Sequence, residues 1–110
     1  MVEGWHIVVG GGMVGLENAT WDDVVDEIRE KFGLTAFRAV GVIDRYTSIC
    51  VQSKNLEKIR EEIEKQKDRY TKAELEALNY LLERTRELRE DEDLVESEGE
   101  VKVVKNEGET

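Results

Sequence analysis

The sequence predicts one small α+β domain at residues 1–89, followed by an acidic tail at residues 90–110. A chain of 110 residues has the length of a single domain. Strand-like apolar runs and segments of helical periodicity fill the first part of the chain, whereas the tail is poor in apolar residues and rich in like charge. We expect a small antiparallel sheet of three or four strands, covered on one face by three helices.

The N-terminal segment predicts a strand and then a helix. Residues 5–9 (WHIVV) are largely apolar and end at the cluster Gly10–Gly12, which is typical of a turn. Thr20 and Asp23 have the spacing of a capping box, which begins a helix by satisfying its free N–H groups. Apolar residues then recur at helical spacing, at Trp21, Val24, Val25, Ile28 and Phe32. Gly33 follows, where a glycine cap would end this helix.

The middle of the chain predicts a β-hairpin. Residues 36–43 (AFRAVGVI) and 47–52 (TSICVQ) are strand-like runs, and the connector 44–46 between them has a length that suits a hairpin. One face of this pair would carry Phe37 and Ile49, while the other face would be neither fully polar nor fully apolar.

Two helices are expected next, over about 55–70 and 71–88, because Thr71 and Glu74 form a second capping box. The tail is expected to be largely disordered, although residues 101–105 (VKVVK) have the composition of a short strand. If that strand joins the sheet, the order is β-α-β-β-α-α-β, a ferredoxin-like arrangement.

Three glycines suggest a cofactor site. Gly10, Gly12 and Gly15 have the spacing G-x-G-x-x-G after the first strand, and this segment resembles the first turn of Rossmann-type flavoproteins. The resemblance implies a backbone that approaches a pyrophosphate at a helix N-terminus. Two observations favour a plain glycine turn instead: the helix begins only after Thr20, and Asp44 lies 29 residues beyond Gly15 rather than about 20. No cofactor is therefore expected, and nucleotide or flavin binding stays as the alternative.

Composition excludes several classes of function. The formal charge is −10, of which residues 90–110 carry −7, and this disfavours binding to nucleic acid or to an anionic membrane. No apolar run is long enough to span a membrane. His6 and Cys50 are the only residues of their types, so one chain has neither a disulfide nor a His/Cys zinc site, and no metal or catalytic residue is assigned. We expect a cytoplasmic protein, and its ion-pair-rich composition is typical of a thermophile.

What remains is association with other proteins. The second sheet face, with Val8, Val40 and Val42, has no evident cover in the sequence, which predicts a homodimer or a partner there. The tail carboxylates would contact a basic partner surface or mimic nucleic acid; its first residues are Glu90, Asp91, Glu92 and Asp93. We therefore expect a regulatory protein-interaction module without enzymatic activity, with an oligomeric structural protein as a further alternative.

Overall fold

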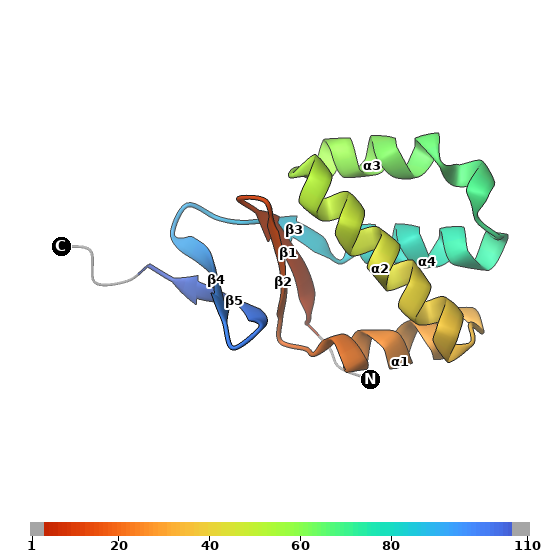
Figure 1. The fold of residues 1–110 in the computed structure, drawn as a ribbon, viewed down its shortest axis with the longest axis horizontal. Helices are drawn as coiled ribbons and strands as arrows, with labels where there is room; N and C mark the ends of the chain where they lie inside the picture. The colour runs from red at the N-terminus through yellow and green to blue at the C-terminus, as the bar shows by residue number, and fades with distance from the viewer. Residues whose placement is uncertain (1–3, 107–110) are drawn as a thin grey trace.

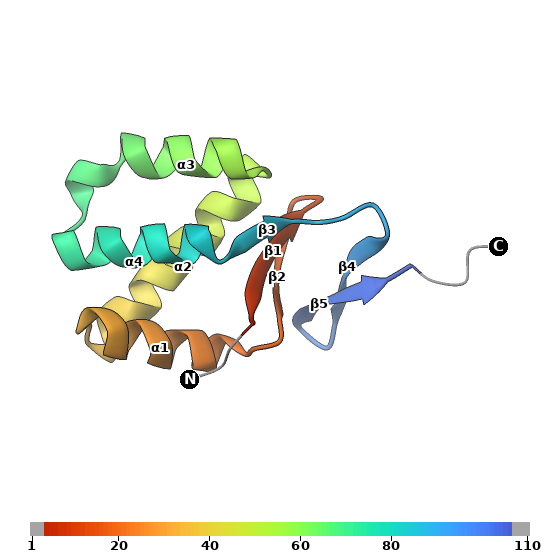
Figure 2. The same ribbon diagram turned by 180° about the vertical axis from the view of Figure 1, so that it is seen from behind.

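The computed structural model describes residues 4–106 and has an α+β fold in three layers (Figure 1). A three-stranded sheet stands in the middle, all four helices lie on one side of it, and a separate two-stranded hairpin lies on the other (Figures 1 and 2). The elements are β1 His6–Gly10, β2 Met13–Glu17, α1 Trp21–Phe32, α2 Ala36–Ser53, α3 Leu56–Lys65, the 3₁₀ turn η1 Lys67–Arg69, α4 Lys72–Glu83, β3 Thr85–Glu87, β4 Glu92–Ser97 and β5 Glu100–Lys105. The α+β class expected from the sequence is confirmed.

The central sheet has the strand order β2-β1-β3 and is mixed rather than antiparallel. β1 pairs with β2 antiparallel and with β3 parallel. The N–H of Ile7 donates to the carbonyl of Arg84 at 2.8 Å, and the N–H of Leu88 donates to the carbonyl of Val9 at 2.9 Å. The ferredoxin-like order is not found, because β3 comes from residues expected to be the end of the last helix.

The glycine cluster forms the turn between β1 and β2. Gly10 pairs with Met13, so the loop has two residues, Gly11 and Gly12, with φ angles of 59° and 77°. Two consecutive positive φ angles are typical of a type I′ turn, whose twist matches that of the flanking strands. The expected turn is confirmed, and the chain continues from it into a second strand rather than into a helix.

The hairpin expected over residues 36–52 is wrong, because this segment is the single helix α2. Thr35 caps its first turn by accepting from the N–H of Arg38. Its buried residues fit a period of 3.6 and face the core: Ala39, Val42, Ile43, Tyr46, Ile49 and Cys50. Packing against α1, α3 and α4 therefore outweighs the strand preference of the β-branched and aromatic residues in this segment.

The helix boundaries that depend on capping are confirmed. Thr20 with Asp23 and Thr71 with Glu74 form complete capping boxes, and Gly33 ends α1 in the left-handed conformation. The helices bury one face of the sheet, where Ile7 and Val9 join the core.

The second face of the sheet, which the sequence left without cover, is covered by the hairpin β4–β5. β5 packs on β2 at Gly15, where an added Cβ would lie 3.0 Å from the carbonyl oxygen of Val101 and 3.1 Å from the Leu94 side chain. Gly15 is thus required for close approach of this hairpin. The structure places residues Glu92–Lys105 in two strands, where the sequence indicated a strand only at 101–105. The division at residue 89 stays a prediction.

Candidate protein-docking face

The three valines predicted to meet a partner lie in different environments. Val8 is fully buried beneath the hairpin side of the sheet, and Val42 is 4% exposed on the core side of α2. Val40 is 45% exposed, on the outer side of α2. Only Val40 of the three therefore belongs to the surface of the folded chain. The predicted common face is wrong because residues 36–53 form one helix, on which Val40 and Val42 lie on different sides.

The four acidic residues predicted at the start of the tail also separate. Glu90, Asp91 and Asp93 are exposed, whereas Glu92 is 3% exposed. The carboxylate of Glu92 accepts two bonds from the guanidinium of Arg86, at 2.7 and 2.9 Å, and a third from the N–H of Arg89 at 3.1 Å. Glu92 therefore holds the fold together and is not available to a partner.

Arg86 joins the sheet to the hairpin. It lies on β3, and besides Glu92 on β4 it donates to the carboxylate of Glu17 on β2, at 3.1 and 3.2 Å. His6 Nδ1 lies 3.7 Å from the same Glu17 oxygen. The paired guanidinium holds the pKa of Glu92 down, at about 2, since an adjacent cation and hydrogen bonds both favour the charged carboxylate.

The glycines predicted to bind a cofactor form no phosphate cradle. Gly10 and Gly12 belong to the hairpin turn, and Gly15 is covered by β5. The nearest following helix N-terminus begins at Trp21, after the whole of β2. A phosphate loop needs that N-terminus directly after the glycines, because its N–H groups and dipole hold the anion.

The polar groups in the core make up the structural interior rather than a catalytic site. Tyr46 donates to Thr85 Oγ1 at 2.6 Å, since the Thr85 hydroxyl itself donates to the carbonyl of Leu81. Burial raises the pKa of the neighbouring Cys50 thiol to about 12, which keeps it protonated and unreactive. His6 cannot assist Cys50, because it pairs with Glu17 on the opposite side of the sheet.

A second buried carboxylate, Glu27, fixes α1 to α4 and to the N-terminus. It accepts from the indole N–H of Trp5 at 3.1 Å and from the hydroxyl of Tyr80. Arg84 stacks over the Trp5 ring at 4.6 Å. Burial and the hydrogen bond to Glu27 raise the pKa of Tyr80 to about 12. Because both carboxylate oxygens of Glu27 accept hydrogen bonds within the core, this side chain has a structural role.

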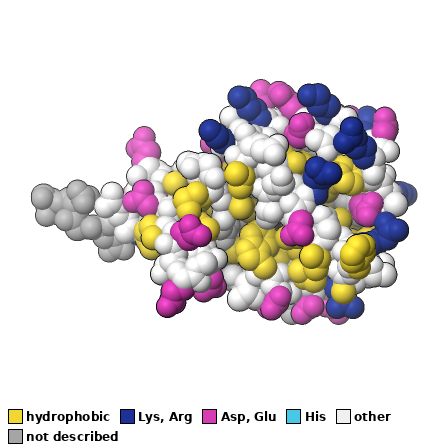
Figure 3. Space-filling model, viewed as in Figure 1, with side chains coloured by type: hydrophobic (Ala, Val, Ile, Leu, Met, Phe, Trp, Pro, Cys, Tyr) yellow, Lys and Arg dark blue, Asp and Glu magenta, His cyan; other side chains and the backbone are white. Residues whose placement is uncertain are grey.

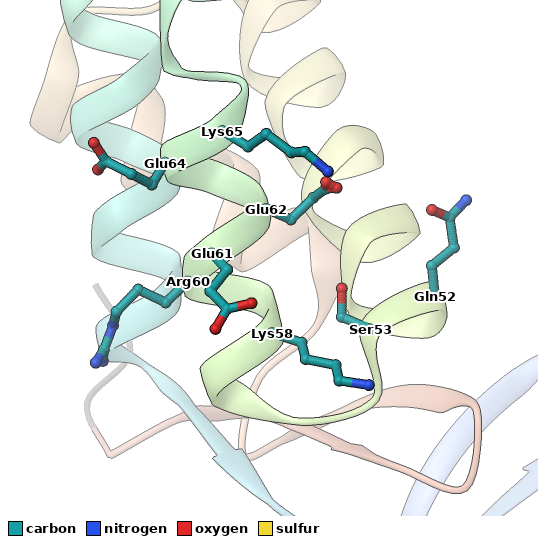
Figure 4. A pocket seen from close by; sticks show the side chains of 8 residues that line it. All are labelled: Gln52, Ser53, Lys58, Arg60, Glu61, Glu62, Glu64 and Lys65. Atoms are coloured by element: carbon teal, nitrogen blue, oxygen red, sulfur yellow. The ribbon is translucent and has the colours of Figure 1, made fainter.

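A wide surface concavity lies on the outer side of α3, beside the end of α2, and has a volume of about 880 Å³. Figure 4 shows that its side chains point outward in different directions: Lys58, Glu62 and Lys65 extend on the side of Ser53, whereas Arg60 and Glu64 extend on the other. Lysines, arginines and glutamates alternate here with no buried polar group among them. The surface is a solvated charged helix face rather than a ligand pocket.

A more apolar groove runs between α1 and α2. Its walls are Val14, Trp21, Val25, Val40 and Ile43. The charged residues that line it are both acidic, Asp22 from α1 and Asp44 from α2. Val14 and Trp21 also line an adjoining hollow, which extends to the tip of the hairpin at residues 99–102. We call the two hollows together the docking face.

Figure 3 shows hydrophobic side chains gathered across the middle of this side of the molecule, with Lys and Arg mainly along the top and at the right-hand end, where some border the hydrophobic side chains. Phe37 extends the apolar surface at the start of α2, where it is 88% exposed. It lines a neighbouring concavity beside Arg45 and Arg69. The two flanks of α2 therefore carry opposite charge.

The sequence did not indicate that Trp21, Asp22 and Asp44 line one groove, or that Phe37 is exposed beside it. Helical spacing could have found the part on α2, since Phe37, Val40, Asp44 and Thr47 share one helix face. The contribution of β2 could not be read in this way, because it depends on the tertiary fold.

Comparisons with protein families, with curated proteins and with solved structures found no match to this chain. Within residues 4–106, no helix has the length and apolar character required to cross a membrane. The same residues contain no group of three His, Cys, Asp or Glu side chains placed to hold a metal ion.

The Arg86–Glu92 pair predicts an acid-sensitive fold. The folded pKa of Glu92, about 2, lies below the ordinary 4.5, so its contribution to stability is complete above about pH 5 and is lost as the pH falls toward 2. We expect the free energy of unfolding, measured by urea titration, to decrease over that range. Glu92→Gln should lower stability at neutral pH and flatten the decrease, with Asp93→Asn as the exposed control. An unchanged acid profile in Glu92→Gln would contradict this assignment.

Proposed function

We propose that the chain is a non-enzymatic protein-interaction module that binds a basic partner through the docking face. The observation that carries the proposal is the apolar surface left exposed on α2. Val40, 45% exposed, lines the groove of the docking face, and Phe37, 88% exposed, lies at the start of the same helix in the neighbouring concavity. Large apolar side chains that gather on one side of a small domain are typical of a protein-binding site. A regulatory role fits such a module.

Charge supports a basic partner. Asp22 and Asp44 line the groove, and the chain has a net charge of −10. Exposed carboxylates of Glu90, Asp91 and Asp93 on the hairpin side add to the same field. Such a field speeds encounter with a cationic surface and selects against anionic ones, nucleic acids included.

Self-association is the second candidate, and one observation favours it. Because Asp44 lies on one flank of α2, and Arg45 lies on the other beside Arg69 of η1, a second copy could pair unlike flanks. The net charge of −10 on each copy opposes this arrangement at low salt. Nucleotide or flavin binding, the other alternative, has only the glycine spacing in its favour.

The proposal is tested by site-specific photocrosslinking. The photoreactive amino acid benzoylphenylalanine replaces Phe37 or Val40, and the protein is irradiated in an extract of its source organism. We expect one dominant adduct from both positions, formed with a chain of basic composition. Glu61, exposed on α3, is the matched control position, and benzoylphenylalanine placed there should not give this adduct. Adducts of the same identity and yield from all three positions, or no adduct from positions 37 and 40, would contradict the proposal. An adduct with twice the chain mass of 12.6 kDa would identify self-association.

Gly41 gives an independent test. It is exposed in the middle of α2, and an added Cβ would meet nothing within 4 Å. A glycine there costs the free chain about 0.5–1 kcal/mol relative to alanine, whereas it lets another chain approach the helix backbone. Gly41 lines the same concavity as Phe37, so we expect Gly41→Ala to stabilise the free protein by that amount in thermal unfolding and to lower the crosslinking yield at position 37. Higher stability together with an undiminished yield would show that no partner approaches this turn of α2.

A further inference from the structure

β2 is an edge strand of the central sheet, and main-chain N–H and C=O groups on its outer side are available to bind another strand. In the two-residue hairpin β1–β2, Gly10 and Met13 form the hydrogen-bonded pair next to the turn, so Val8 with Gly15 and His6 with Glu17 are the next such pairs. The alternate residues of β2, Val14 and Leu16, must therefore direct their N–H and C=O groups away from β1.

The other side of β1 confirms this alternation. Ile7 and Val9, which face Leu16 and Val14 across the hairpin, use their main-chain groups to bind the β3 side. Among the strands of residues 4–106, none pairs with the outer side of β2. Over the described part of the chain, neither Val14 nor Leu16 forms a main-chain hydrogen bond on the outer side of β2.

This edge lies along the docking face. Val14 and Leu16 line the hollow between the start of α1, at Ala19–Trp21, and the hairpin tip, at Gly99–Lys102. From there Val14 and Trp21 lead into the acidic groove between α1 and α2. We propose that an extended segment of the partner adds to β2 as a fourth strand and places a lysine or arginine in that groove; this deepens the proposed function and rests on it.

The side-chain preference follows from the groove. The groove offers an entering side chain both apolar surface, from Trp21, Val25 and Val40, and the carboxylates of Asp22 and Asp44, which are exposed. Lysine and arginine have long apolar stems that end in a cation, and so match both parts. Main-chain bonds to Val14 and Leu16 supply affinity, and the groove supplies the choice of side chain, as in other cases of strand addition.

The occupant is a segment of another protein rather than a second copy of this chain. Among the described strands, the one with lysines is β5, which is already paired with β4 and packed on β2 of its own chain. A second copy would also bring a second net charge of −10 against the acidic groove. A single unpaired strand of opposite charge avoids both obstacles.

The test uses random twelve-residue peptides displayed on phage, with the intact protein as the target, followed by synthetic copies of the selected peptides. We expect selection of extended sequences that alternate apolar residues with lysine or arginine. On binding, amide exchange at Val14 and Leu16 should slow at least tenfold, whereas the Gly15 amide, bonded to β1, should not change. Binding that leaves Val14 and Leu16 unaffected, or a selection that yields no peptide, overturns strand addition.

Two variants separate the main chain from the side-chain groove. Val14→Pro removes one outward N–H and should weaken peptide binding at least tenfold, while the matched Val14→Thr, which keeps the N–H, should not. Asp22→Asn combined with Asp44→Asn should abolish the preference for lysine or arginine and leave neutral peptides bound. Peptide affinities unaffected by Val14→Pro contradict strand addition. Adducts at positions 37 and 40 that survive Val14→Pro would keep the proposed function while removing this mode of binding, whereas a doubled mass would name a second copy as the occupant.

Discussion

The bidentate contact between Arg86 and Glu92 is the interaction on which the layered fold depends. Arg86 projects from β3 toward the hairpin side and is held by carboxylates from two other strands, Glu17 on β2 and Glu92 on β4. The Glu92 side chain is almost fully buried, so the pair fixes the position of the hairpin rather than merely adding surface charge. Removal of Arg86 would leave the buried Glu92 carboxylate without its cation, whereas removal of Glu92 would leave Arg86 with Glu17 alone.

The position of the hairpin decides which surfaces remain for a partner. The hairpin covers one face of the sheet and the helices cover the other, so Val8 and Val9 are both buried. A partner can therefore reach the described part of the sheet at its edges but not at its faces. Residues 99–102 and the start of α1 then form two walls along the edge of β2. The acidic C-terminal segment is thus a structural part of the docking face, and its deletion would expose the sheet as well as remove charge.

The sequence was sufficient where a local signal decides the structure, as at the capping boxes of Thr20 and Thr71 and at the type I′ turn of Gly11 and Gly12. It misled over residues 36–52, whose β-branched residues fit a strand pattern while their burial follows a helical period. The absence of a glycine in the connector 44–46 was a signal against a hairpin there. Conversely, Gly99 lies between the runs 92–97 and 100–105, and its place there was a signal for the C-terminal hairpin. The like charge of the same segment favoured disorder instead. The docking face was beyond prediction, since it joins β2, α1 and α2 only after folding.

The contact between the hairpin and Gly15 offers the most direct measurement. In a nuclear Overhauser spectrum of the protein at neutral pH, the account predicts cross-peaks from the Gly15 α-protons to the methyl groups of Leu94 and Val101, since the space of a missing Cβ brings these groups together. It also predicts strand-like chemical shifts over residues 92–105. Absence of these cross-peaks, with random-coil shifts over the same residues, would contradict it, because the second sheet face would then be uncovered and the walls along β2 would not exist.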